Sequence, residues 1–369
     1  MLEPGDRATQ IQWNVKTDQR ALLKQMPKID LHRHLEGSLR LQTLAEIAIE
    51  HGIDLPTYST EELRPYVQVL PGEQDFHTFL AKFRLLRKFY QSQEAVERVA
   101  YEAVADAAAD NVRYLELRFN PVALSRAQGF GFSQVTGWVC QAIARAQGDY
   151  AIRVRLILQI GRDESLDTAA QIIQVAHAYR ERGVVGIDLA GDEINYPPHR
   201  FAELFSRARE DGLGITVHAG EAGGAQNVRT AVELLKAQRI GHGVRVVEDS
   251  TVVHFVRQQQ IAFEVCPTSN FQTGVVHSLT HHPLPDMLAL KLHVTINTDD
   301  PSISDTTLTD EYLVATKVLG LSMEQIEKAN LTAIDAAFLP EEEKDELRKQ
   351  FEQWYKEQPQ AASPTPLDE

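Results

Sequence analysis

Eight short apolar runs, separated by segments with helical periodicity, recur along this chain and constrain its fold more than any other feature. Short β-branched runs that end in Gly, Pro, Asn or Asp are typical of strands, and the segments between them are long enough to cross back over a sheet. Regular alternation predicts a parallel sheet, and eight repeats predict a closed (β/α)8 barrel of the TIM type. The runs are KIDLHRHLEG, VRYLELRFNP, RVRLILQIG, VVGIDLAGD, LGITVHAGE, RIGHGVRV, IAFEVCPTSN and HVTINTDDP.

The segment between the first two runs, about residues 40–110, is longer than one crossover needs. We expect it to form a helical insertion at the barrel mouth, with one helix over FHTFLAKFRLLRKFY, and we expect extra helices near the C-terminus. Phe76, Phe79 and Phe83 could form an apolar lid, although packing within the helical core is the simpler role for each. We predict a flexible segment over 1–20, one barrel domain over 21–356 and a disordered tail over 357–369.

Composition narrows the class of ligand. The formal net charge is −15, and no basic patch interleaved with aromatic residues occurs, which argues against a nucleic-acid partner. The two cysteines form no disulfide framework and no C-x-x-C pair, as expected in a reducing cytoplasm. No apolar stretch has the length of a signal peptide core or a membrane span. We therefore expect a cytoplasmic protein that binds a small uncharged or cationic molecule.

Titratable side chains gather at the C-terminal ends of the predicted strands, where parallel barrels carry their catalytic groups. His32 and His34 close the first strand, and both imidazoles point to the same side because strand side chains alternate. Other strands contribute further groups at the same end. These are His218 after the fifth strand, His242 after the sixth, and Asp299 with Asp300 after the eighth.

Imidazoles together with one carboxylate form a ligand set suited to Zn²⁺ that leaves one position open for water. Zinc lowers the pKa of that water to about 7, which supplies a nucleophile near neutral pH. Glu221, three residues after His218, falls just beyond its strand, where its carboxyl group could exchange a proton with a substrate. The spacing predicts one catalytic zinc with Glu221 as the general acid/base.

Simpler interpretations exist for each of these residues alone. A single strand histidine is usually a satisfied polar residue, and HAGE could be a turn with a solvated Glu221. Asp299 and Asp300 could cap a helix that begins at Pro301. The coincidence of four strands that each deliver such a group at one end favours a site instead. No role is assigned to the other histidines, namely His51, His77, His177, His199, His254, His277, His281, His282 and His293.

The segments LHRHLEGSLR, DLAGDE, VHAGE, RIGHG, CPTSN and NTDDP resemble, in that order, the signature segments of the adenosine deaminase family. The resemblance extends from about Pro27 to Leu339 and implies a (β/α)8 barrel with one catalytic zinc per chain. It implies hydrolytic deamination of adenosine or 2′-deoxyadenosine to inosine or 2′-deoxyinosine and ammonia, by attack of a zinc-activated hydroxide on purine C6.

The resemblance also implies a role for each matching residue. His32, His34, His218 and Asp299 look like the zinc ligands, and Asp299 would also contact the metal-bound water. Glu221 looks like the residue that protonates purine N1, and His242 like the residue that orients the attacking hydroxide. The remaining matches are on the substrate side, where Asp300 resembles the contact to N7, Gly191 the backbone donor to N3, and Glu36 the residue near the ribose hydroxyls.

Glu36 departs from the family pattern, because the best-known adenosine-specific members carry Asp at this position. The carboxylate reaches one methylene further, so the sugar side is the part of the substrate that the resemblance fixes least. A deaminase of another 6-aminopurine compound, such as 6-aminodeoxyfutalosine or adenine, stays open as the alternative.

Two other classes of protein fit the sequence less well. A barrel hydrolase with two metals bridged by a carboxylated lysine would need a lysine in the third or fourth strand, and RVRLILQIG and VVGIDLAGD contain none. A non-catalytic binding protein would be expected to have lost Glu221 or a ligand, and all of them are present. The sequence leaves the oligomeric state open.

Overall fold

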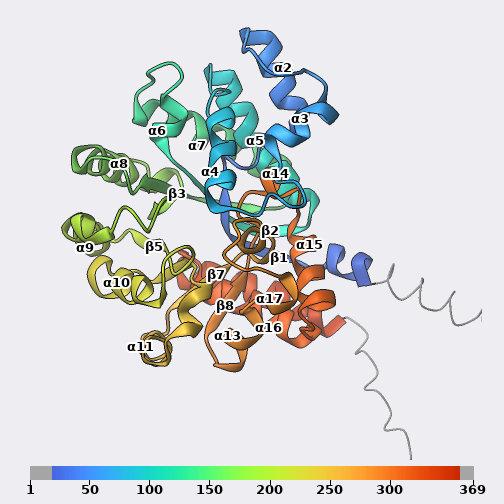
Figure 1. Cartoon of the computed structure of the whole chain (residues 1–369), viewed down its shortest axis with the longest axis vertical. Coiled ribbons are helices and arrows are strands. Elements are labelled where there is room, and N and C mark those ends of the chain that lie inside the picture. Colours follow the sequence, from blue (N-terminus) through green and yellow to red (C-terminus); the bar gives the residue numbers. More distant parts are fainter. Residues whose placement is uncertain (1–18, 358–369) are drawn as a thin grey trace, which may run out of the picture.

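Eight parallel strands, hydrogen-bonded in chain order from β1 to β8, form the centre of the computed structural model, which describes residues 19–357 (Figure 1). The strands are β1 (Lys28–His34), β2 (Val112–Phe119), β3 (Arg153–Gly161), β4 (Val184–Ala190), β5 (Gly214–Ala219), β6 (Arg239–His242), β7 (Ala262–Val265) and β8 (His293–Ile296). All eight coincide with predicted runs, so the strand assignment is confirmed.

The sheet closes between its first and last strands. Arg33 and Asp299 form a parallel bridge beyond the end of β8. Around it, the His34 N–H donates to the Asp299 carbonyl at 2.9 Å, and the Asp299 N–H donates to the His32 carbonyl at 2.8 Å. The predicted (β/α)8 barrel is confirmed, and its closure places Asp299 directly beside the two histidines of β1.

Helices surround the barrel, and those of the predicted insertion gather at the top of the view in Figure 1. The insertion holds α2 (Leu41–His51), α3 (Thr60–Val67), α4 (Phe76–Leu86) and α5 (Gln93–Ala109). Ser92 caps α5 by accepting from the Ala95 N–H, and Asp75 caps α4 by accepting from the Thr78 N–H. The helix expected over FHTFLAKFRLLRKFY is therefore present as α4, with its start fixed by a side-chain cap.

The other α-helices cover the remaining strands or follow β8. They are α6 (Pro121–Ser125), α7 (Phe132–Asp149), α8 (Leu166–Ala178), α9 (Ala202–Glu210), α10 (Ala225–Leu235), α11 (Ser250–Gln258), α12 (Pro267–Gln272), α13 (Leu284–Ala289), α14 (Pro301–Ser304), α15 (Leu308–Leu313), α16 (Met323–Ala336) and α17 (Glu341–Glu357). Short 3-10 turns lie at η1 (Arg180–Arg182), η2 (Pro198–Phe201), η3 (Val244–Glu248) and η4 (Leu279–His281), and a π turn lies at η5 (Val314–Val318).

The barrel interior contains a charged network below the strand ends. Glu264 Oε2 accepts from Arg118 Nη2 at 2.8 Å, and Glu264 Oε1 accepts from Arg239 Nε at 2.6 Å. Arg118 also contacts Asp188 at 3.1 Å, and Arg239 also contacts Glu116. All five side chains are buried, and buried charges of this kind are tolerated only when they are paired and hydrogen-bonded. This network lies inside the barrel, directly beneath the strand ends that carry the site.

Both predicted terminal segments fall largely outside the described residues. The helical turn that precedes β1 spans residues 19–25 and thus begins inside the segment expected over 1–20, of which the rest lies outside the described residues. The tail expected over 357–369 also lies outside them, except for Glu357, which ends α17. Among the helices of residues 19–357, none combines the length and apolar character needed to cross a membrane.

Candidate metal and active site

Three strands bring four potential ligands together at the C-terminal end of the barrel. His32 and His34 both point inward from β1, and their Nε2 atoms lie 3.3 Å apart. Each of these two atoms lies 3.2 Å from Asp299 Oδ1. The His218 ring from β5 lies 4.6 Å from the His32 ring, measured between centroids. These four side chains are those that the sequence predicted as zinc ligands.

Each of the three imidazoles is held by a partner at Nδ1. Acceptor oxygens lie at 2.8 Å from His32 Nδ1, 2.8 Å from His34 Nδ1 and 3.1 Å from His218 Nδ1. The partners belong to neighbouring or facing strands, and they are Glu264 Oε2, Gln159 Oε1 and Asp188 Oδ1 respectively. Because an acceptor at Nδ1 fixes the proton there, all three Nε2 lone pairs are free to converge on one cation.

The electrostatics also fit a metal site. Burial lowers the pKa of His218 to about 4, although Asp188 opposes the shift, so the ring is neutral as a ligand must be. Burial alone would raise the pKa of Asp299, but His242, His32 and His34 hold it well below its usual range, so the carboxylate is charged. Imidazoles around one charged carboxylate are the donor set of a divalent cation site.

His242 lies in the same cluster. Ligand atoms of His32, His218, His242 and Asp299 all lie within 4.8 Å of one another. His242 Nε2 lies 3.7 Å from Glu221 Oε2 and 3.9 Å from Asp299 Oδ2. Its backbone has φ of +59° and that of Asp299 has φ of +65°, a left-handed conformation that non-glycine residues rarely adopt. Such conformations concentrate at functional sites, where the surrounding structure enforces them.

Glu221 is buried rather than solvated, which rules out the simple interpretation of HAGE as an exposed turn. Glu193 anchors its loop by accepting from the backbone N–H groups of Gly220 at 3.0 Å, Glu221 at 2.8 Å and Gly223 at 2.5 Å. Burial, reinforced by Asp299 and Glu193, raises the pKa of Glu221 well above its usual range. The raised pKa favours the protonated form of the Glu221 carboxyl group, which can donate a proton.

Asp299 and Asp300 occupy different environments. Ser269 Oγ donates to Asp299 Oδ2 at 2.7 Å. Asp300 stands at the N-cap position of α14, but its side chain makes no capping hydrogen bond, so helix capping does not explain it. Burial, reinforced by Asp299 and Glu36, raises the pKa of Asp300 well above its usual range. Asp300 Oδ1 is buried without a hydrogen-bond partner, which leaves it available to a ligand.

These groups open onto one cavity at the barrel mouth. Its polar side includes His34, Glu36, Gly191, Glu221 and Asp300, and its apolar wall comes from α4. That wall consists of Phe76, Phe79, Leu80 and Phe83. Phe76, Phe79 and Phe83 of the insertion therefore face the site, while Phe79 is also part of the hydrophobic core. A wider cavity lies near the opposite ends of β3, β4 and β5, but no histidine lines it.

The Glu36 side of the cavity carries unsatisfied polar atoms. Glu36 is buried, and its Oε1 accepts from the Asn120 N–H at 2.8 Å while its Oε2 has no partner. Arg87 lines the same side, and its Nε is also without a partner. A buried acceptor and a buried donor left open on one wall of a cavity indicate a polar part of the ligand.

Comparison with known proteins agrees with this geometry. The model of the family described as adenosine deaminase matches residues 27–354. The chain belongs to the adenosine deaminase family. An adenosine deaminase of Clostridium botulinum (strain 657 / Type Ba4) is 38% identical over 326 residues, which cover 88% of this chain and 98% of that protein. As a member of the adenosine deaminase family, the chain is a hydrolase that acts on a purine C–N bond.

Solved structures resemble the whole barrel. An adenine deaminase from Arthrobacter aurescens has a TM-score of 0.83 at 31% identity, over 90% of this chain and 99% of that one. An amidohydrolase from Burkhoderia ambifaria, solved with bound zinc, has a TM-score of 0.84 at 28% identity, over 91% of this chain and 92% of that one. The adenosine deaminase family is metal-dependent, and the cluster of histidines and Asp299 fits a metal site.

Every residue predicted for the site from the sequence surrounds this cavity or its ligand cluster, whereas the residues that support it were missed. Gln159, Asp188 and Glu264 hold the histidine rings, Glu193 holds the Glu221 loop, and Asn270 contacts His242. A signal for three of them existed, because a charged or amide side chain inside an otherwise apolar strand needs a buried partner. The sequence alone does not say which partner that is.

Proposed function

We propose that this protein deaminates adenosine and 2′-deoxyadenosine with one bound zinc ion. His32, His34, His218 and Asp299 would hold the metal, since three imidazole rings and one carboxylate converge there. When bound, zinc supplies a Lewis acid that lowers the pKa of water to about 7. The observation that carries the proposal is the pair of buried carboxyl groups, Glu221 and Asp300, that line the cavity beside that cluster.

These two carboxyl groups match the acceptors of a 6-aminopurine ring. A protonated carboxyl group can donate to a ring nitrogen, which an ionised one cannot. Glu221 would protonate N1, which makes C6 electrophilic, and Asp300 would donate to N7 and fix the orientation of the ring. Gly191, which lines the same cavity with φ of +105°, would offer its backbone N–H to N3.

The chemistry then proceeds by addition and elimination at C6. Water adds to C6 as Glu221 gives its proton to N1. His242, whose Nε2 lies 3.7 Å from Glu221 Oε2, donates a hydrogen bond to the attacking oxygen. The Glu221 carboxylate takes up the proton that water releases and passes it to the 6-amino group. The C6–N bond breaks and ammonia leaves, and the proton of the new C6 hydroxyl group returns to the Glu221 carboxylate as the 6-oxo purine forms. Glu221 is thereby restored, and the overall reaction consumes one water.

The sugar side supports a second candidate substrate. Glu36 Oε2 and Arg87 Nε are both open, so this wall offers one acceptor and one donor to whatever is attached to the purine. A ribose hydroxyl group can donate to the acceptor, whereas a larger substituent such as that of 6-aminodeoxyfutalosine offers further polar atoms for the donor. Adenine would leave both unsatisfied, which disfavours it here even though an adenine deaminase shares the fold.

A substrate screen with metal analysis tests the proposal. Purified protein is expected to contain one zinc per chain and to deaminate adenosine and 2′-deoxyadenosine faster than adenine, AMP or 6-aminodeoxyfutalosine, followed by the change in purine absorbance. Chelation should abolish turnover and added zinc should restore it. Two metals per chain would refute the proposed site, and no deamination of adenosine or 2′-deoxyadenosine by zinc-loaded protein would refute the proposed substrate.

Glu221→Gln tests the assigned proton transfer. The variant keeps the size of the side chain but cannot cycle a proton, so kcat should fall about 10²–10⁴-fold while zinc stays bound. Glu233→Gln is the matched control, because Glu233 is exposed on α10 and its carboxylate pairs with Arg229 at 2.8 Å, on a helix outside the cavity. Substantial activity in Glu221→Gln would contradict the proton role.

A further inference from the structure

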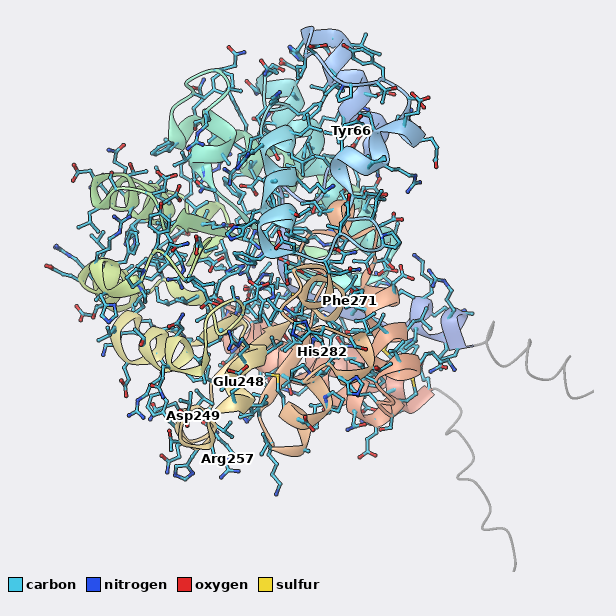
Figure 2. The ribbon with its side chains drawn as sticks, viewed as in Figure 1. Tyr66, Glu248, Asp249, Arg257, Phe271 and His282 are labelled. Carbon is cyan, nitrogen blue, oxygen red and sulfur yellow. The ribbon has the colours of Figure 1, made fainter. Side chains whose placement is uncertain are left out.

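A line of buried hydrogen bonds runs from the backbone into His242. The Leu284 N–H donates to His282 Nδ1 at 3.0 Å. His282 Nε2 lies 3.2 Å from Asn270 Oδ1, and Asn270 Nδ2 lies 3.1 Å from His242 Nδ1. The three side chains are at most 3% exposed. His282 lies near the middle of the view in Figure 2, in the same region as Phe271 of α12.

The donor and acceptor in each of these hydrogen bonds follow from the first bond, in which the Leu284 N–H is the donor. A backbone N–H can only donate, so His282 Nδ1 must be the acceptor and must carry no proton. Burial lowers the pKa of His282 to about 3, so the ring is neutral and its single proton lies on Nε2. That proton requires an acceptor, which makes the facing atom of Asn270 its oxygen.

The orientation of Asn270 then determines His242. With Oδ1 turned to His282, the Asn270 amide nitrogen faces His242 Nδ1 and donates to it. His242 Nδ1 is therefore unprotonated. An imidazole ring with no proton on Nδ1 carries its one proton on Nε2. This is the reverse of His32, His34 and His218, which each face an acceptor oxygen at Nδ1.

We infer that Asn270 and His282 are positioning residues that hold His242 as its Nε2–H tautomer, so that it acts as a hydrogen-bond donor in the site and not as a metal ligand. Distance alone does not distinguish His242 from a metal ligand, because its ring nitrogen lies within 4.8 Å of ligand atoms of His32, His218 and Asp299. The position of the His242 proton does distinguish it. The catalytic part of the inference rests on the proposed function. A donor aimed at the attacking oxygen stabilises charge that develops there, whereas a lone pair would repel it.

Asn270→Asp keeps the size of the side chain but replaces the donor that faces His242 Nδ1 with an acceptor. A carboxylate has no N–H, so it accepts from His282 on one oxygen and presents the other to His242 Nδ1, which favours a proton at Nδ1. The Nε2 of His242 would then carry a lone pair. Loss of one such donor costs about 10²–10³ in kcat, and KM should change much less.

His282 offers a pair of variants of equal size. His282→Gln can accept from the Leu284 N–H with its oxygen and donate to Asn270 with its amide, so it should retain much more of kcat than His282→Glu, which presents only acceptors. His281→Gln is the matched control, because His281 is the exposed neighbour and its ring contacts Thr280 Oγ1 at 3.1 Å. A purely structural role for His282 would make Gln and Glu equally damaging.

The tautomer is read directly by NMR of zinc-loaded protein labelled with ¹⁵N-histidine, with the His242 signals assigned by their absence in His242→Gln. The expected spectrum shows an unprotonated Nδ1 and a protonated Nε2 for His242, and the reverse in Asn270→Asp. A proton on Nδ1 in the wild type, or a metal-bound Nε2, would overturn the inference. A reversed tautomer with unchanged kcat would overturn its catalytic part. Because the spectrum needs no substrate, a failure of the proposed substrate leaves this measurement decisive.

Discussion

Glu264 joins the barrel interior to the metal cluster, so replacing it should affect both stability and metal binding. Its Oε2 accepts from His32 Nδ1 and Arg118 Nη2, each at 2.8 Å. Its Oε1 accepts from Arg239 Nε at 2.6 Å and from Thr216 Oγ1 at 3.0 Å. Four donors thus converge on one carboxylate that is fully buried.

Glu264→Gln keeps the shape of the side chain but removes its charge and turns one acceptor into a donor. Breaking a buried ion pair by changing one partner costs about 3–5 kcal/mol. Arg118 keeps Asp188 and Arg239 keeps Glu116, so the lower end, about 3 kcal/mol, is the expected loss in free energy of unfolding. Loss of the partner that holds His32 should also weaken metal affinity about 10–100-fold.

Urea denaturation of the metal-free protein, followed by circular dichroism at neutral pH, measures the first effect. Competition with a chromophoric chelator measures the second. Glu248→Gln is the control, because Glu248 is half-exposed beside Arg245 in η3 and should change stability by less than about 1 kcal/mol (Figure 2). If metal-free Glu264→Gln unfolds at the same urea concentration as Glu248→Gln, the energetic reasoning is refuted.

The contribution of Glu264 to the free energy of unfolding should depend on pH. Burial alone would raise the pKa of Glu264, but Arg118 and Arg239 hold it well below its usual range. A carboxyl group with a depressed folded-state pKa contributes stability above its unfolded pKa of about 4.3, and the contribution is lost as pH falls towards the folded value. The difference in stability between wild type and Glu264→Gln should therefore shrink in acid.

Two further predictions concern the substrate side of the site. A Cβ added at Gly37 would lie 1.8 Å from Asp300 Oδ1, so Gly37→Ala should displace Asp300 and lower kcat/KM about 100-fold. Gly148→Ala, at an exposed position of α7 where an added Cβ would meet no atom within 4 Å, should leave kcat/KM unchanged. Equal kinetics for the two variants would contradict the assigned role of Asp300. Because burial and the nearby carboxylates raise the pKa of Glu221, and its protonated form is the donor, kcat/KM should fall as pH rises through that pKa; a wild-type profile without this alkaline limb would argue against Glu221 as the acid.

Much of this protein was determined by local patterns in its sequence. The eight strands could be predicted because each is a short apolar run bounded by turn residues, and the barrel followed from their alternation with helices. The predicted ligands could be located because barrel strands deliver their functional groups at one end. The period of two in KIDLHRH was enough to place His32 and His34 on one face.

The tertiary structure decided how those groups are held and charged, because this depends on contacts between distant segments. His32 is fixed by Glu264, 232 positions away, and the Glu221 loop by Glu193, 28 positions away. His282 had no role in the sequence-based interpretation, since nothing local distinguishes it from the exposed His281. Its burial beside Asn270 gives it one. Protonation depends on burial and on the atoms that surround a group, and only the folded chain supplies both.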